Sequence, residues 1–125
     1  MDRDGVMRWV DAYVRAWRED DVEAVTRLFT EDARYLTSPY EEPLVGHTGI
    51  QGFWLDDQGH TFTATAEPVA VADLDAVVRL EVRYGDPVDQ EYRDLWILRF
   101  AADGRVEHFE EWAYWPGRPY GAGAE

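Results

Sequence analysis

The sequence predicts an α+β domain in which one curved, mixed but mostly antiparallel sheet wraps around N-terminal helices. The first half of the chain carries apolar residues at helical spacing, and from residue 62 onward apolar residues alternate with polar ones. Helices followed by a run of strands are typical of α+β domains, because each layer must bury its apolar side against the other. The 125 residues suffice for one core. We expect one domain over residues 1–115 and a Pro/Gly-rich tail over residues 116–125.

Helical spacing is clearest at the start of the chain, over residues 4–18. Their apolar side chains fall on one face, which is unusually aromatic. The members of this face are Val6, Trp9, Val10, Tyr13, Val14 and Trp17. Asp20 followed by Glu23 is typical of a capping box and predicts that a second helix starts there. His47 or Thr48 is expected to cap a third helix.

Strand patterns occupy most of the second half. The expected strands, one short and four long, cover residues 34–37, 62–72, 74–84, 91–100 and 106–115. Pro68 lacks a backbone N–H, so it predicts a bend or bulge in its strand. Asp103 followed by Gly104 predicts a tight hairpin turn before the last strand. The last strands are therefore expected to form an antiparallel meander.

The charge of the chain argues against two classes of partner. Asp and Glu number 26 against 12 basic residues, all of them arginine, so the formal net charge is −14. Such a field repels phosphate backbones and anionic lipid headgroups, so we expect neither nucleic acid nor a membrane surface as a partner. The absence of cysteine excludes thiolate chemistry. No apolar run is long enough for a membrane span and no signal peptide is expected, which favours a cytoplasmic location.

Two stretches of the chain carry a family resemblance. They are residues 12–54, AYVRAWREDDVEAVTRLFTEDARYLTSPYEEPLVGHTGIQGFW, and residues 93–112, RDLWILRFAADGRVEHFEEW. The first resembles the opening half of the nuclear transport factor 2-like superfamily, SnoaL-like branch, and the second resembles its final hairpin. The resemblance implies a cone-shaped fold. Ketosteroid isomerase belongs to the same superfamily, and the fold also hosts cyclases, dehydratases, epoxide hydrolases and binding proteins, so function has to be argued from the site.

The resemblance to ketosteroid isomerase is only partial at the catalytic positions. Tyr13 falls where the isomerase has its oxyanion-hole tyrosine, although it fits equally as one more ring of an apolar stripe. At the position of the isomerase's aspartate base this chain has Ser38, between Thr37 and Pro39, and a hydroxyl cannot accept a proton at neutral pH. The second acid of the isomerase corresponds to Trp96. Steroid-type isomerisation by that mechanism is therefore disfavoured.

Two carboxyl groups are candidates to replace the missing acids. If Trp96 faces the interior, strand alternation places Asp94 on the same face, and the matching register of the last strand turns Glu111 inward. A slip of one residue would bring Glu110 inward instead. Two neighbouring carboxyl groups can share a proton, one acting as acid and the other as base. Alternatively, each carboxylate pairs with an arginine, Arg34 first among them, in a buried structural brace.

The expected site combines these polar groups with aromatic walls. The loop RYLTSPYEEPL, residues 34–44, is expected to form one lip of the cone, with ring walls and hydroxyl tips. The residues predicted to bind substrate are Trp17, Tyr35, Tyr40, Trp54, Tyr92, Trp96 and Phe109. The residues predicted to be catalytic are Tyr13, Asp94 and Glu111.

Neither a metal nor an organic cofactor is expected. His47 precedes a helix, His60 lies in a Gly-bounded loop, and His108 is expected on the outer face of the sheet, so no two of them have the spacing of a zinc site. The glycines do not form a phosphate-binding loop.

Two functions of different class follow from this pattern. The first is an enzyme that performs acid/base chemistry, such as cyclisation, isomerisation or dehydration, on a small, mostly apolar, neutral molecule. The second is a noncatalytic ligand-binding or dimerisation domain, in which the aromatics fill the cone and the outer sheet face forms a homodimer, as the resemblance implies. A pKa-shifted Asp94 or Glu111 beside an open cavity would favour the enzyme. A filled cavity, or carboxylates neutralised by arginine, would favour the second function.

Overall fold

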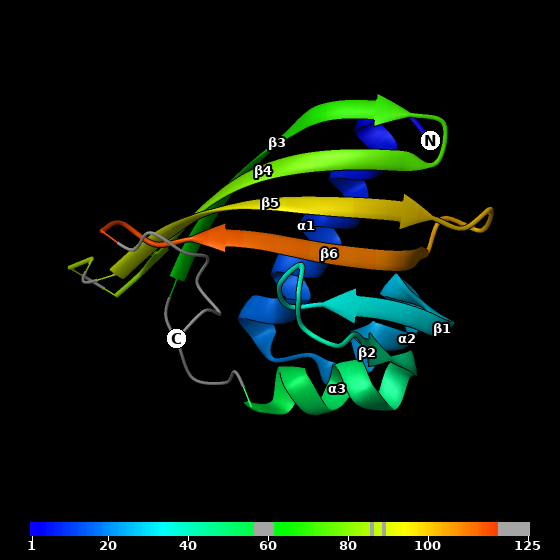
Figure 1. Ribbon diagram of the computed structural model, residues 1–125, viewed down its shortest axis with the longest axis horizontal. Helices are drawn as coiled ribbons and strands as arrows, with labels where there is room; N and C mark the ends of the chain where they lie inside the picture. The colour runs from blue at the N-terminus through cyan, green and yellow to red at the C-terminus, as the bar shows by residue number, and fades with distance from the viewer. Residues whose placement is uncertain (57–61, 86, 89, 118–125) are drawn as a thin grey trace.

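The computed structural model describes residues 1–56, 62–85, 87–88 and 90–117. Figure 1 shows a curved sheet with α1 crossing behind it and α3 beside β1 and β2. In chain order the elements are α1 (Arg3–Glu19), the 3-10 helix η1 (Val22–Ala24), α2 (Val25–Leu28), β1 (Phe29–Leu36), β2 (Leu44–Val45), α3 (Gly46–Asp56), β3 (Phe62–Ala72), β4 (Asp75–Tyr84), β5 (Gln90–Phe100) and β6 (Val106–Tyr114).

The six strands form one mixed sheet in the order β2-β1-β6-β5-β4-β3. β3, β4, β5 and β6 form an antiparallel meander, while β1 pairs parallel with β6. The predicted α+β class and the mostly antiparallel sheet are therefore confirmed. Because the order is linear and β2 and β3 are its edges, the sheet stays open, and α1 crosses one of its faces (Figure 1).

The first helix agrees with its prediction to within one residue at each end. Asp2 caps it, since its carboxylate accepts a hydrogen bond of 2.7 Å from the backbone N–H of Gly5. Asp20 ends it in the left-handed conformation, with φ 54°. The aromatic stripe is buried at Trp9 and Tyr13, which packs this face of α1 against the sheet.

The predicted capping box is wrong. Asp20 closes α1 instead of opening the next helix, and Asp21, the N-cap of η1, makes no side-chain capping hydrogen bond. The reversal at Asp20 is fixed by the Asp21 N–H, which donates to the Ala16 carbonyl at 2.8 Å. The following helix ends at Leu28, because Phe29 is extended and begins β1 opposite β6. The segment after α1 therefore contains less helix and more strand than the sequence pattern predicts.

The predictions of the four long strands hold closely, whereas the short strand expected over residues 34–37 runs from Phe29 to Leu36 as β1. The pairing of β3 with β4 shifts register between Pro68 and Ala70, which confirms the predicted bulge. Along β5 the alternation is complete, and every second side chain is buried against α1 or its neighbours. These inward residues are Tyr92, Asp94, Trp96, Leu98 and Phe100. The interior of the fold is therefore built mainly from β5, β6, β1 and α1.

The start of α3 depends on a glycine. Gly46 has φ +76°, and a Cβ on it would lie 3.1 Å from the Glu31 carbonyl oxygen. We expect Gly46→Ala to lower the free energy of unfolding by about 1–2 kcal/mol, because other L residues are strained in this conformation. Gly52→Ala in the same helix is the matched control: no heavy atom lies within 4 Å of its Cβ, so we expect a neutral or slightly stabilising change. Urea unfolding curves that give equal effects at the two glycines would contradict this explanation.

Candidate functional site

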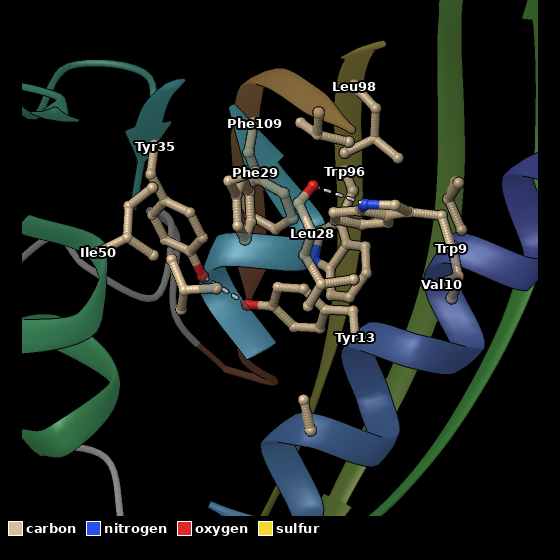
Figure 2. Close-up of a cluster of buried hydrophobic side chains, with 14 of the residues drawn as sticks. Trp9, Val10, Tyr13, Leu28, Phe29, Tyr35, Ile50, Trp96, Leu98 and Phe109 are labelled. Carbon is tan, nitrogen blue, oxygen red and sulfur yellow. Dashed lines mark hydrogen bonds between the residues drawn. The ribbon is translucent and has the colours of Figure 1, made fainter. Parts of the chain in front are cut away.

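Buried aromatic rings fill the space between α1 and the sheet, as Figure 2 shows. Tyr13 is at the centre: its ring centroid lies 4.6 Å from that of Trp96 and 5.1 Å from that of Trp54. Phe109 lies nearly parallel to Tyr13, with ring centroids 5.5 Å apart. The structure therefore brings together Tyr13 and three of the residues predicted to line a pocket.

A pair of phenols forms the first polar part of the cluster. The hydroxyl oxygens of Tyr13 and Tyr35 are 2.6 Å apart and buried (Figure 2). Burial raises the pKa of both groups, and the charge of Glu111 raises it further. Both phenols therefore keep their protons at neutral pH, and only one of the two protons is used in the bond between them. The other phenol can donate to a third group.

A pair of carboxyl groups forms the second polar part. In the pairing of β5 with β6, Trp96 is opposite Glu111 and Asp94 is opposite Ala113. Asp94 and Glu111 are therefore diagonal neighbours on one face of the sheet. The inward register of Glu111 is thus confirmed, and Glu110 belongs to the opposite face.

Asp94 is held in its protonated form. Burial, followed by the charge of Glu111 and the hydrogen bond between the two side chains, raises the pKa of Asp94 to about 11. Its Oδ2 accepts a hydrogen bond of 3.0 Å from Trp96 Nε1, whereas Oδ1 is buried and meets no donor among the described residues. A proton on Oδ1 would turn this oxygen into a donor, and Glu111 is the acceptor across the strand pair. At neutral pH the two groups can thus hold one proton between them.

The predicted arginine brace is wrong for Arg34. Its side chain is exposed, and its position in β1 is opposite His108 of β6. His108 in turn contacts Glu110, with 3.2 Å between His108 Nε2 and a carboxylate oxygen, on the outer face of the sheet. Asp94 is therefore neutralised by a proton and not by Arg34.

Two more predicted wall residues lie toward one end of the sheet. Tyr92 packs on Trp115 with ring centroids 4.7 Å apart, and burial, together with the charge of Glu111, raises its pKa. Trp17, near the end of α1, stacks on Phe62 with centroids 4.0 Å apart. These rings extend the aromatic surface from the carboxyl pair toward the first residues of β3 and β5.

Tyr40 is the one predicted wall residue that the structure does not support. Its side chain is 100% exposed in the turn after β1, so it does not join the cluster. Tyr35 was expected at the lip of the cone, and it is 2% exposed inside β1. The sequence gives a signal for this placement, since Ala33 and Tyr35 are two residues apart in a strand and share its buried face.

Trp9 is a member of the cluster that the site prediction left out. Its indole Nε1 donates to the Leu28 carbonyl at 2.9 Å, and its ring centroid is 5.5 Å from that of Tyr13 (Figure 2). Of two cavities lined by described residues, one is lined in part by Trp9 and the other by residues of β3 and β4, and neither is lined by Tyr13, Asp94 or Glu111. An open pocket beside Tyr13 and the carboxyl pair therefore stays a prediction.

No metal-binding cluster of three or more His, Asp or Glu side chains occurs in the part of the chain that the structure describes. The predicted cap at His47 or Thr48 is wrong, because α3 begins at Gly46 and both residues lie inside it. His47 instead donates a hydrogen bond of 2.8 Å to the Phe29 carbonyl, while His60 lies outside the described residues. The described helices include none with both the length and the apolar character needed to cross a membrane.

Comparison with known proteins identifies the fold and the family. One solved structure, described as the epoxide hydrolase/cyclase-like enzyme SalBIII in pyran ring formation in the polyether salinomycin, superposes with a TM-score of 0.72. The match is 17% identical in sequence and covers 93% of this chain and 94% of that one, which shows a shared fold. A search of curated proteins found no match. The model of the SnoaL-like domain matches residues 10–109, and the chain therefore belongs to the SnoaL-like domain family of the nuclear transport factor 2-like superfamily.

Proposed function

We propose that this protein is an acid/base enzyme of the cyclase, isomerase or dehydratase type, acting on a small, mostly apolar, neutral molecule. The observation that carries the proposal is the pairing of buried Asp94 with half-buried Glu111, in which Asp94 keeps its proton at neutral pH. A neutral carboxylic acid beside a second carboxyl group can donate one proton and accept another in the same step. Such pairs with strongly shifted pKa values cluster at functional sites.

The proton flow can be followed for a cyclisation. Asp94 donates its proton to the oxygen that leaves or opens, while the Glu111 carboxylate removes the proton of the attacking hydroxyl group. The new carbon–oxygen bond then closes the ring, Asp94 is left ionised and Glu111 protonated. Transfer of this proton along the hydrogen bond between the two side chains restores the starting state. The cycle consumes no other reactant.

The phenol pair supplies a neutral hydrogen-bond donor in this scheme. Tyr35 holds the Tyr13 hydroxyl at 2.6 Å, and burial keeps both protonated. A phenol held in this way can stabilise negative charge that develops on a substrate oxygen. We therefore assign Tyr13 to the developing oxyanion and Tyr35 to the positioning of Tyr13, while Glu111 takes the role of the base that is missing at Ser38.

The surroundings support a neutral, apolar substrate. The walls assigned to substrate binding are Trp17, Tyr35, Trp54, Tyr92, Trp96 and Phe109. Trp54, Trp96 and Phe109 add ring surface beside Tyr13, while the negative charge of Glu111 next to them disfavours an anionic substrate at this site. The similar solved structure is that of an epoxide hydrolase/cyclase-like enzyme in pyran ring formation, which supports cyclisation first among the three reaction types.

Three neutral compounds distinguish the reaction types. A hydroxy-epoxide tests cyclisation, a β-hydroxy ketone tests dehydration and a β,γ-unsaturated ketone tests isomerisation, each followed by chromatography of the products. We expect turnover of at least one of them, and we expect Glu111→Gln and Asp94→Asn to lower kcat by about 10²–10⁴-fold. Glu110→Gln is the matched control, because Glu110 is the neighbouring residue on the opposite face of β6. A wild-type protein that converts none of the three, or equal losses in all three variants, would contradict the proposal.

One observation favours the noncatalytic alternative. Trp54 and Trp96 each lie within ring-contact distance of Tyr13 at the centre of the fold, as expected of a filled core. Saturable binding of one of the test compounds without any turnover would support this alternative.

The homodimer and the cytoplasmic location also stay proposals. Leu95 is 38% exposed on β5 and gives the outer face of the sheet an apolar part. Light scattering tests the dimer directly.

A further inference from the structure

A groove runs along α1 on a part of the surface that the proposed reaction does not use. It lies between α1, the segment of η1 and α2, and the turn between β5 and β6, and it has a volume of about 490 Å³. We call it the α1 groove. The lining residues on which the argument rests are Arg8, Trp9, Ala12, Arg15, Ala16 and Leu28. Its volume is within the range of small-molecule sites, about 300–1,000 Å³.

The floor of the α1 groove is apolar and open, because its helical positions carry alanine, which is both apolar and small. Ala12 and Ala16 are one turn apart on the same side of α1, and Ala24 faces them from η1. Trp9 and Leu28 complete the floor, and the hydrogen bond from Trp9 Nε1 to the Leu28 carbonyl joins the two walls. The floor can therefore accept an apolar group.

Two arginines on the rim have no acidic partner. Arg8 and Arg15 are exposed and line the groove, yet neither forms an ion pair in the part of the chain that the structure describes. The third arginine of the groove, Arg27, is paired with Asp21 at 3.1 Å. Other exposed arginines of the described residues also form no ion pair, but Arg8 and Arg15 are the two that line the groove. Its lining thus has three arginines against two acidic residues, Glu19 and Asp21, and Asp21 is the one paired with Arg27.

The spacing of these arginines suits one anionic group. Their Cα atoms are two helical turns apart, roughly 10.5 Å along the axis, and Ala12 lies between them. In the structure the Arg8 guanidinium lies beside Gly5, so it has to swing toward Ala12 to meet that of Arg15 at one ligand; both arginines are exposed and the alanine side chain is short, which leaves room for this movement. Each guanidinium can bind a carboxylate or phosphate through two parallel hydrogen bonds.

We propose that the α1 groove binds a small, soluble, amphipathic anion. Its anionic oxygen group is held by Arg8 and Arg15 above Ala12, and its apolar part lies on the floor of Ala16, Trp9 and Leu28. The net charge of −14 repels polyanions and anionic membranes, so the occupant carries a single acidic group and comes from solution. This ligand is distinct from the neutral substrate of the carboxyl pair, and the proposal does not depend on that reaction.

The groove and the candidate site share one side chain. Trp9 lines the groove and its ring centroid is 6.3 Å from that of Trp96, whose indole binds Asp94. A ligand in the groove therefore contacts a residue that packs against the candidate site. This contact also makes binding detectable through tryptophan fluorescence.

Isothermal titration with 1-naphthyl phosphate tests the proposal on the full chain. We expect saturable binding that weakens at least tenfold when NaCl rises from 50 to 500 mM, and that is at least tenfold tighter than binding of neutral 1-naphthalenemethanol. The double variant Arg8→Gln with Arg15→Gln is expected to weaken binding at least tenfold, and Ala12→Leu is expected to block it. Arg99→Gln is the matched control, because Arg99 is an exposed arginine of β5 paired with Asp75, away from the groove. Thermal unfolding checks that each variant is folded.

Several outcomes would overturn the proposal. They are no saturable binding to the wild type, equal affinity for the neutral naphthalene compound, or unchanged affinity in the Arg8 and Arg15 double variant. Inorganic phosphate that binds as tightly as naphthyl phosphate would rule out the apolar part of the site. Co-sedimentation with phosphatidylglycerol vesicles would identify a lipid surface in place of a soluble ligand. Turnover by the carboxyl pair is measured separately, so a failure here leaves the proposed reaction unaffected.

Discussion

Asp94→Asn is expected to make the protein more stable than the wild type at alkaline pH. The pKa of Asp94 is raised to about 11 in the folded protein, mainly by burial and then by Glu111, whereas an unfolded aspartate titrates at about 3.9. Between these values the folded state binds the extra proton, so the free energy of unfolding falls as pH rises, by about 1.4 kcal/mol for each pH unit. The contribution is complete below pH 4 and is lost progressively toward pH 11. From pH 6 to pH 9 the loss is about 4 kcal/mol.

Comparing how steeply the free energy of unfolding falls with pH in the wild type and in the variant separates the contribution of Asp94 from that of the other carboxylates. Asn keeps the shape of Asp94 and an oxygen for the Trp96 indole, but it does not titrate. Urea unfolding at pH 6, 7, 8 and 9 is expected to give a steeper decline for the wild type than for Asp94→Asn. Asp75→Asn is the control, since Asp75 is an exposed residue paired with Arg99, and it should keep the wild-type slope. Parallel declines for the wild type and Asp94→Asn would mean that Asp94 is ionised in the folded protein.

Phe109→Ala is expected to lower the free energy of unfolding by about 3–5 kcal/mol, the usual range for a fully buried phenylalanine. Phe109 has no exposed surface, and its ring is nearly parallel to those of Tyr35 and Tyr13, with centroids 4.4 Å and 5.5 Å away. Removing the ring deprives both phenols of a packing partner and leaves a cavity beside Trp96. The change is measured by urea unfolding at pH 7.

Phe53→Ala provides the matched control for this substitution. Phe53 is also a phenylalanine beside Tyr35, with ring centroids 5.6 Å apart, but it is half-buried on α3. Its loss should cost less than half as much, because less apolar surface returns to water and solvent fills the gap. Similar losses at the two positions would show that Phe109 is not a central support of the phenol pair.

Most of the sheet could be predicted from the sequence, because strands that pack on one face alternate strictly. The alternation of β5 placed Asp94 and Trp96 inward. The bulge at Pro68 followed from the missing N–H of proline. These features depend on local chemistry, which a single sequence contains. The inward register of Glu111 depends in addition on a register shift between Arg99 and Phe100, which the turn at Gly104 does not predict.

The remaining features depend on contacts between distant segments. The Asp20 and Glu23 pattern fits a capping box, yet Asp20 ends α1 in the left-handed conformation. The helix that follows stops at Leu28, because Phe29 is extended and pairs in the sheet. The bond between Tyr13 and Tyr35 joins α1 to β1, and no periodicity within either element reveals it. Tyr40 carries the same aromatic signal as its neighbours, but its turn leaves it in solvent. Aromatic character alone does not determine on which side of a loop a ring falls.

The parallel pairing of β1 with β6 has a consequence for how the chain reaches its native state. Leu36 lies opposite Glu110, so the sheet is joined in its middle by two segments that are far apart in the sequence. Closing so long a loop costs chain entropy before the pairing stabilises it, and folds dominated by such pairings form slowly. During synthesis the aromatic face of α1 has no complete sheet to cover it until β6 has left the ribosome. The nascent chain is therefore expected to need protection from aggregation until its last strand is made.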